Sequence, residues 1–301
     1  MDDRWLADRF EEHRRRLRAV AYRILGSLTE ADDAVQDTWL QLSRSDAGEI
    51  ENLGGWLTTV VGRVALNRLR TRARRREDAL AVRLPDPVVR REGERPPEDE
   101  VVLVESVGLA MLVALDTLAP AERVAFVLHD VFALPFEEIA PLLDRSTAAT
   151  RQLASRARRR VRSAEVPTPD PDGDRQREAV DAFLSAARDG DLDALVAVLD
   201  PDVVVRIAAA ADRPASSMVV NGAEAAARQM RPGLRSTLGR PTVELHPVLV
   251  NGAAGMVVTQ DGQPLFLLAF TVAHGWIAEI DVFADPARVG RLTEAALAGG
   301  A

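Results

Sequence analysis

The sequence contains no cysteine, which excludes disulfides, thiolate zinc sites and catalysis by a thiol. All 38 basic residues are arginines, because lysine does not occur in the chain. There is therefore no lysine for a phosphate-binding loop and none for a Schiff base. The four histidines are scattered and show no spacing typical of metal ligands, so neither a metal nor a cofactor is expected.

Long uncharged apolar runs are also missing. No segment approaches the roughly 18 apolar residues that a membrane span needs, and the first residues show no apolar stretch typical of a secretory signal. With 47% apolar residues the chain can still fill real cores, and 301 residues are enough for two or three domains. We expect a multi-domain cytoplasmic protein that does not engage a membrane.

The net charge of −8 conceals two clusters of arginine. Seven arginines lie in residues 63–76 and seven in residues 145–162, and neither range contains an acid. Two basic stripes on helices are typical of a nucleic-acid binder, although either one alone could be a solvated helix face. Residues 166–301, in contrast, hold 11 arginines against 18 acids.

Proline-rich and charged segments divide the chain, because such segments favour extended linkers over packed elements. The division predicts a helical domain at 1–80, a linker at 81–105, a second helical domain at 106–165, a linker at 166–174 and a third domain at 175–301.

The first domain is predicted to be helical throughout. Gly26 ends one amphipathic helix, and Thr29 is expected to cap the next, which runs from Glu30 to Leu42 with acids and Trp39 on it. A polar loop at 43–55 separates this helix from a helix over 56–76 that begins apolar and ends in the first arginine cluster.

The second domain ends in two helices separated by a tight turn. The pattern predicts helices over Phe136–Leu143 and Ser146–Arg162, with Ser146 as the N-cap of the second. This arrangement is typical of a helix-turn-helix.

The third domain mixes helices and strands. Apolar alternation and the turn pairs Asn251-Gly252 and Asp261-Gly262 predict an antiparallel meander, which follows helices and so indicates an α+β domain. Helices are expected at 175–189, 191–199 and 222–230, and strands at 203–208, 242–250, 254–259, 264–273 and 276–283, with a further turn at His274-Gly275.

Three segments of the helical domains resemble bacterial RNA polymerase sigma factors of the extracytoplasmic-function group. DAVQDTWLQL at 33–42 is similar to the segment that grips the polymerase clamp helices. WLTTVVGRVALNRLR at 56–70 is similar to the helix that reads the minus-ten element. EEIAPLLDRSTAATRQLASRAR at 137–158 is similar to the helix-turn-helix that reads the minus-thirty-five element.

The third domain resembles a SnoaL-like domain, an α+β cone-shaped barrel, and the fusion is similar to mycobacterial members of the sigma-factor group. The likeness lies in VNGAAGMVV at 250–258, DGQP at 261–264 and IAEIDVFADPARV at 277–289. Two motifs depart from the family, and Arg63 in the minus-ten helix stands where an Asn is common. Its linker sequence Trp-Leu-Pro-Glu-Pro is here Arg-Leu-Pro-Asp-Pro at 83–87, and its terminal Asn-Pro-Asp-Lys-Leu is Asp-Pro-Ala-Arg-Val at 285–289.

The resemblance implies three sets of contact residues and no catalytic ones, with core RNA polymerase and promoter DNA as partners. Trp39 and Trp56 could equally well be packed in the hydrophobic core of the first domain, without contacting a partner. Polymerase contacts are expected at Asp33, Gln36, Asp37, Trp39 and Leu40; minus-ten contacts at Trp56, Thr59, Arg63, Asn67, Arg70 and Arg74; minus-thirty-five contacts at Thr147, Ala148, Arg151, Gln152, Ser155, Arg156 and Arg160.

Two alternatives remain open at this point. The chain could be a stand-alone helix-turn-helix regulator with a ligand-sensing C-terminal domain, or a SnoaL-type enzyme tethered to DNA. Its polar candidates for acid–base chemistry are Asp202, His246, His274 and Asp281, and they are scattered. We favour a non-catalytic sigma factor that the third domain regulates in cis. Whether that domain also binds a small-molecule ligand is left open by the sequence.

Overall fold

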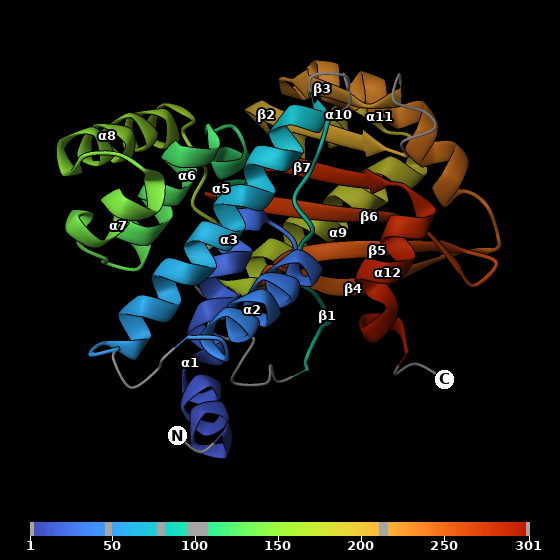
Figure 1. Ribbon diagram of the computed structural model, residues 1–301. Helices are drawn as coiled ribbons and strands as arrows, with labels where there is room; N and C mark the ends of the chain where they lie inside the picture. Colours follow the sequence, from blue (N-terminus) through green and yellow to red (C-terminus); the bar gives the residue numbers. More distant parts are fainter. Residues whose placement is uncertain (1–2, 46–49, 77–81, 95–107, 211–215, 299–301) are drawn as a thin grey trace. The chain divides into compact units, whose positions relative to one another are not determined.

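The computed structural model describes residues 3–45, 50–76, 82–94, 108–210 and 216–298. Parts of the predicted 43–55 loop and 81–105 linker, at 46–49, 81 and 95–105, lie outside these residues. Among the described helices, none is both long and apolar enough to cross a membrane. The chain forms two compact units (Figure 1). Unit 1 is Met1–Ala79, Pro96–Val107 and Met111–Val166; unit 2 is Leu80–Arg95, Gly108–Ala110 and Pro167–Ala301.

The first part of unit 1 is a bundle of α1 (Asp3–Leu25), α2 (Leu28–Leu42) and α3 (Leu53–Arg76). Gly26 follows α1 with a φ of 69°, a conformation that glycine adopts without steric cost. The expected cap at Thr29 is wrong, because α2 begins earlier and Ser27 is its N-cap residue. Helix α3 also begins earlier than expected, since the Asn52 side chain accepts a hydrogen bond from the Gly55 amide at 3.0 Å.

The second part of unit 1 is helical as predicted and ends in the helix-turn-helix. Asp144 takes a left-handed conformation in the turn, and the Ser146 hydroxyl accepts a bond from the Ala149 amide at 3.2 Å. Thr150 and Ala154 bury the inner face of the second helix. The elements are α5 (Leu109–Asp116), α6 (Pro120–Phe126), the π-turn η2 (Val127–Val131), α7 (Phe136–Leu143) and α8 (Thr147–Ser163).

Unit 2 is an α+β domain, as expected, built on one mixed sheet with the strand order β1-β4-β5-β6-β7-β2-β3. Its helices are α9 (Gly173–Asp189), α10 (Leu192–Val198), α11 (Ala223–Leu238) and α12 (Pro286–Leu297). Its strands are β1 (Val89–Arg91), β2 (Leu199–Ala209), β3 (Met218–Asn221), β4 (Val243–Val250), β5 (Ala253–Gln260), β6 (Gln263–Ala273) and β7 (Trp276–Ala284).

The predicted meander is confirmed as β4 to β7, each strand antiparallel to the next. Asn251, Asp261 and His274 have positive φ, each followed by a glycine that also has positive φ, as two-residue hairpin turns require. Beyond the expectation, β2 runs parallel to β7, and β1 and β3 form the two edges of the sheet.

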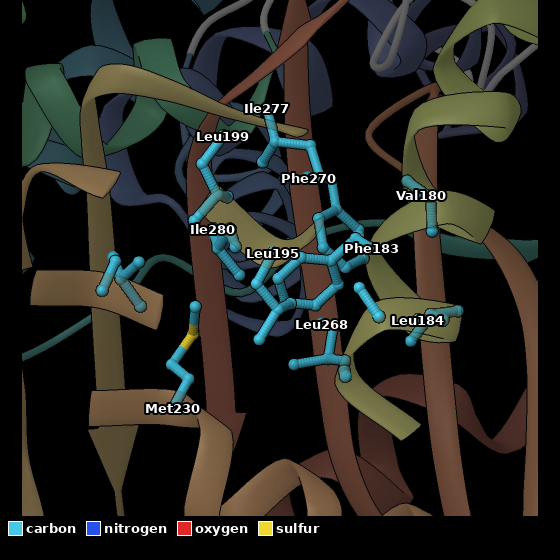
Figure 2. Close-up of a cluster of buried hydrophobic side chains, with 14 of the residues drawn as sticks. Val180, Phe183, Leu184, Leu195, Leu199, Met230, Leu268, Phe270, Ile277 and Ile280 are labelled. Carbon is cyan, nitrogen blue, oxygen red and sulfur yellow. The ribbon is translucent and has the colours of Figure 1, made fainter. Parts of the chain in front are cut away.

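Helices α9, α10 and α11 cover the inner face of this sheet with apolar side chains. Phe183 of α9 meets Phe270 of β6 edge to face, with ring centroids 5.5 Å apart, while Met230 of α11 approaches from the other side (Figure 2). The core of unit 2 therefore lies between these helices and strands β2, β5, β6 and β7.

Candidate polymerase, DNA and linker interfaces

Four of the five predicted polymerase contacts on α2 fall on one outward face: Asp33, Gln36, Asp37 and Leu40. Leu40 is exposed, although it is a large apolar residue, and Gln36 is exposed beside it. Asp33 and Asp37 are bound to Arg68 of α3, at 3.2 and 2.7 Å, yet about half of each carboxylate side chain remains accessible. Trp39 is partly buried against Phe10, with ring centroids 5.2 Å apart.

The predicted minus-ten contacts on α3 lie three or four residues apart, which places them along one side of the helix. None of them is buried, whereas Arg68 and Arg72 turn the other way toward the bundle. Arg72 donates to the Leu25 carbonyl at 3.0 Å and pairs with Glu30. The predicted residues along this side are Trp56, Thr59, Arg63, Asn67, Arg70 and Arg74.

The second helix of the helix-turn-helix presents most of its predicted base-reading residues to solvent. The Arg151 guanidinium lies over the Phe136 ring at 5.3 Å, which orients it at the start of α8. Thr147 is half-buried, and the exposed members are Ala148, Arg151, Gln152 and Ser155.

Two predicted DNA contacts have an intramolecular partner that sequence reasoning missed. Arg156 and Arg160 both bind the buried carboxylate of Glu122 in α6, each at 2.9 Å. Arg158 pairs with Asp130 in the same way. These contacts fix the flank of α8 against the preceding helices, while about half of the Arg156 and Arg160 side chains stays accessible.

The linker between the two helical domains contributes a strand to unit 2. Residues Val89–Arg91 pair antiparallel with Val248–Val250 of β4. Asn251, at the β4–β5 turn, makes two hydrogen bonds to Val88, the residue before the linker strand. Its side-chain oxygen accepts from the Val88 amide at 2.7 Å, and its own amide donates to the Val88 carbonyl at 2.9 Å. Val88 and Leu84 are buried, so this segment is part of the core.

Helix α12 holds the same linker through Arg288. The guanidinium donates to one oxygen of Asp86 at 2.8 and 2.6 Å and to the Leu84 carbonyl at 2.6 Å. It also lies 4.9 Å from the Phe283 ring centroid, which orients it. The Asp285 side chain caps α12 by accepting from the Arg288 amide at 3.2 Å.

At its other end this linker segment is bound to α9, where Arg177 pairs with Glu92. We call residues 84–92, with their partners Asn251, Arg288 and Arg177, the linker clasp. Sequence reasoning identified the motifs at 83–87 and 285–289 separately but gave no sign that they bind each other.

The second linker is bound to unit 2 as well. The Asp170 carboxylate accepts from the amides of His274 and Gly275 at 3.0 and 2.8 Å, and these bonds hold the pKa of this carboxyl below its ordinary value. Its backbone amide donates to Val272 at 2.8 Å, and Gln176 donates to the Asp170 carbonyl at 2.6 Å.

The inner side of the unit 2 core contains a cavity of about 190 Å³. None of the polar candidates for catalysis lines it. Asp202 and His274 are exposed, and His246 bonds to the Thr259 hydroxyl at 2.9 Å on a different part of the sheet.

Asp281, the fourth candidate, belongs to a buried ionic cluster. Arg206 of β2 donates to Glu279 at 2.8 Å and to Asp281 at 3.2 Å. Burial raises the pKa of Asp281 to about 7, against the opposing attraction of Arg206. The second oxygen of Glu279 has no hydrogen-bond partner among the described residues.

Three family models match the chain: Sigma-70 region 2 over residues 9–75, Sigma-70 region 4 over 108–161 and the SnoaL-like domain over 180–280. The ECF RNA polymerase sigma factor SigJ of Mycobacterium tuberculosis is 41% identical over 219 residues, which are 73% of this chain and 70% of SigJ. The probable ECF RNA polymerase sigma factor SigI of the same species is 33% identical over 291 residues, 96% of each chain. The crystal structure of M. tuberculosis SigJ superposes with a TM-score of 0.71 and 35% identity, covering 94% of this chain and 97% of SigJ.

Proposed function

Because the chain belongs to the extracytoplasmic-function RNA polymerase sigma factors, which bind core polymerase and direct promoter-specific initiation, we propose that its SnoaL-like domain regulates that activity in cis through the linker clasp. A stand-alone helix-turn-helix regulator would need no region 2 domain, so this alternative is set aside.

The observation that carries the proposal is the attachment of both linkers to one domain. Residues 84–92 are joined to β4, α9 and α12, and Asp170 is joined to the β6–β7 turn. Along the chain, these two segments are the covalent connections on either side of the helix-turn-helix domain, which also packs against α1 and α3 within unit 1. The SnoaL-like domain therefore limits the positions that the helix-turn-helix domain can reach.

This restraint acts on promoter recognition because the two DNA elements lie at a set distance along the promoter. A free linker allows region 2 and region 4 to sample many separations, and tying down part of it removes some of those separations. Release of the clasp lengthens the connection again. The clasp thus changes how often region 4 binds the minus-thirty-five element while region 2 occupies the minus-ten element.

For the contacts themselves, we propose that the outward face of α2 docks on polymerase. The exposed side of α3 would bind the unwound minus-ten strand, and the start of α8 would read the minus-thirty-five element. On α2, the accessible carboxylates of Asp33 and Asp37 would form a charged rim around Leu40, which would be the apolar anchor of the interface. On α8, Arg151 and Gln152 have side chains suited to bidentate hydrogen bonds with guanine and adenine. Arg156 and Arg160 would reach phosphates with the guanidinium groups that Glu122 orients.

We further propose that the SnoaL-like domain has no catalytic role and that the protein acts in the cytoplasm, together with polymerase. The support for the first part is that the apolar cavity of about 190 Å³ is lined by no acid, histidine or arginine among the described residues. General acid–base catalysis needs such a group within reach of a bound substrate. A separate pocket of about 630 Å³ is lined by His246 and Glu244, which lie 3.7 Å apart.

The test is run-off transcription with core polymerase and a double variant, Asn251→Gly with Arg288→Met. Glycine tolerates the φ of 47° at position 251, so the turn survives while the side-chain bond to Val88 is lost. We expect promoter-dependent transcription to change at least threefold at unaltered affinity for core polymerase. Arg291→Met is the control, because Arg291 bonds only to its own helix in the described structure. Equal transcription by the double variant and the parent, with the linker shown to be released by hydrogen exchange, would overturn the proposal.

A further inference from the structure

Glu122 is a buried acid beneath the basic side chains of the helix-turn-helix domain. It lies in the first turn of α6, which packs beside α8 (Figure 1), and only 7% of its side chain is exposed. One carboxylate oxygen accepts from Nε of Arg156 and the other from Nη1 of Arg160, each at 2.9 Å. Because little water reaches a buried carboxylate, these two ion pairs are present before any DNA is bound.

Each of the two guanidinium groups has further donors, because arginine carries its N–H groups in a planar fork. Arg156 holds Glu122 through Nε, which leaves both of its Nη groups, and Arg160 uses one Nη group, which leaves Nε and the other Nη. About half of each arginine side chain is exposed. Each arginine can therefore hold Glu122 with one part of the fork and a phosphate with another.

Glu122 also reduces the charge that this part of α8 offers to DNA. Arg156 and Arg160 carry two positive charges, and the carboxylate between them cancels one. The attraction between arginine and phosphate is the same for every DNA sequence and supplies essentially all of non-specific binding. The ion pairs therefore weaken binding to any duplex, while the proposed base-reading residues Arg151 and Gln152 lie at least one turn earlier on the helix.

The same ion pairs restrict the register in which α8 can engage a duplex. Phosphate contacts fix the position and orientation of a protein on DNA, whereas base contacts supply the sequence information. Two guanidinium groups held by one carboxylate match the phosphates in few registers, while free arginine side chains adapt to many. The held pair favours the register in which Arg151 also reaches its base.

We infer that Glu122 is a positioning residue that sets the ratio of promoter binding to non-promoter binding. It lowers non-specific affinity by cancelling one charge, and it preserves the specific complex by holding two phosphate contacts in one geometry. Glu122 acts through Arg156 and Arg160. The inference rests on the proposed contact of α8 with the minus-thirty-five element.

The test measures binding of the full-length chain to two duplexes by fluorescence anisotropy, over a range of salt concentrations. One duplex is selected from a random pool by the parent protein, and the other is the same sequence scrambled. Glu122→Gln keeps the shape of the side chain and removes its charge. We expect about three- to tenfold tighter binding to the scrambled duplex, with a salt slope steeper by about one. The selected duplex should gain less, so that the ratio of the two affinities falls at least about threefold.

Two further variants separate charge from geometry. Glu122→Asp keeps the charge but is one methylene shorter, so it cannot hold both arginines; the ratio should fall while the salt slope stays parental. Glu137→Gln is the matched control, because Glu137 is exposed on α7 and forms no ion pair among the residues that the structure describes. It removes the same charge and should leave the ratio unchanged. Circular dichroism checks the fold of each variant, and Glu122→Asp decides the test if Glu122→Gln does not fold.

Arg160→Ala distinguishes the inference from the proposed function on which it rests. If Arg160→Ala weakens binding to both duplexes while the folded Glu122 variants keep the parental ratio, Glu122 is a structural residue only and the inference is overturned. The same holds if Glu137→Gln lowers the ratio as much as Glu122→Gln does. If the parent selects no duplex, or Arg160→Ala changes binding to neither, the proposed DNA contact of α8 is wrong and the inference fails with it.

Discussion

Replacing Arg288 by methionine tests how strongly the linker is held. The substitution keeps an apolar stem against Phe283 but removes the bonds to Asp86 and to the Leu84 carbonyl. A hydrogen bond to a charged group contributes about 1.5–3 kcal/mol. Two of the three bonds share one oxygen, and the Arg288 and Asp86 side chains are 19% and 33% exposed, so solvent screening reduces their sum. We estimate about 2–3 kcal/mol for local opening of the clasp, or roughly a 30- to 160-fold increase in its open population.

Hydrogen exchange of the Val88 amide measures that population, because this amide donates to Asn251 in the clasp. Its protection should fall by the same factor in Arg288→Met, while the amide of Ile280, in the middle of the sheet, keeps the parental value. Arg291→Met on the same helix should change neither. Unaltered protection of Val88, or an equal loss at Ile280, would refute the reasoning that Arg288 holds the linker locally.

The remaining predictions concern the two functional faces and the buried cluster. Asp37→Arg should abolish binding to core polymerase in a pull-down, since a like-charge contact in an interface costs several kcal/mol, and normal binding by a folded variant would remove α2 from the interface. In promoter-binding titrations Arg151→Ala should lose about 1–3 kcal/mol at one or two upstream positions, whereas Arg160→Ala should weaken all sequences alike with a smaller salt dependence; identical profiles would contradict this division. Because the pKa of Asp281 is raised to about 7 from an unfolded value near 3.9, the folded state retains a proton that the unfolded state loses between about pH 4 and 7. Stability should therefore fall as pH rises through this window, by up to about 1.4 kcal/mol per pH unit, and urea unfolding should show a flatter profile for Asp281→Asn but not for the exposed control Asp202→Asn.

The parts of the fold that could be predicted are those with local signals. Ser146 marks the start of the second helix of the helix-turn-helix, and Asn251-Gly252 specifies a hairpin, because cap and turn geometry depend on a few adjacent residues. The contact residues expected on α3 and α8 came from the family resemblance, and their three- and four-residue spacing places them along one side of each helix. These elements needed no knowledge of distant contacts.

The linker strand could not be predicted in this way. Val88 and Val89 form a very short apolar signal after Pro85 and Pro87, and prolines favour the interpretation as a free linker. Their partner strand ends at Val250, about 160 residues further along the chain, so no local pattern reports the pairing. Tertiary contact alone turns this segment into a sheet edge.

The same reason explains the missed partners of the arginine cluster in α8. Arg156 and Arg160 were predicted as DNA contacts from charge and helical position, while Glu122 lies 34 and 38 residues earlier. A basic stripe on a helix reports the charge available to a phosphate. It does not report which of its members a buried carboxylate already orients.

The two departures from the family motifs make sense together. Where the family's linker has Glu, this chain has Asp86, and where its terminal motif has Lys, this chain has Arg288; these are the two residues that form the ion pair of the clasp. Asp is shorter than Glu by one methylene, and the guanidinium of Arg reaches further and presents a planar fork of donors. We therefore expect one change to compensate for the other across the contact.

This compensation can be measured by a double-mutant cycle on Val88 protection. Arg288→Lys alone should weaken the clasp, because the ammonium group falls short of Asp86 and the fork that also serves the Leu84 carbonyl is lost. Adding Asp86→Glu restores the reach, so the double variant should recover much of the loss, with a coupling of about 1 kcal/mol. If the free-energy losses of the two single variants simply add in the double variant, the two residues are not energetically coupled. The departures at 83–87 and 285–289 would then need separate causes.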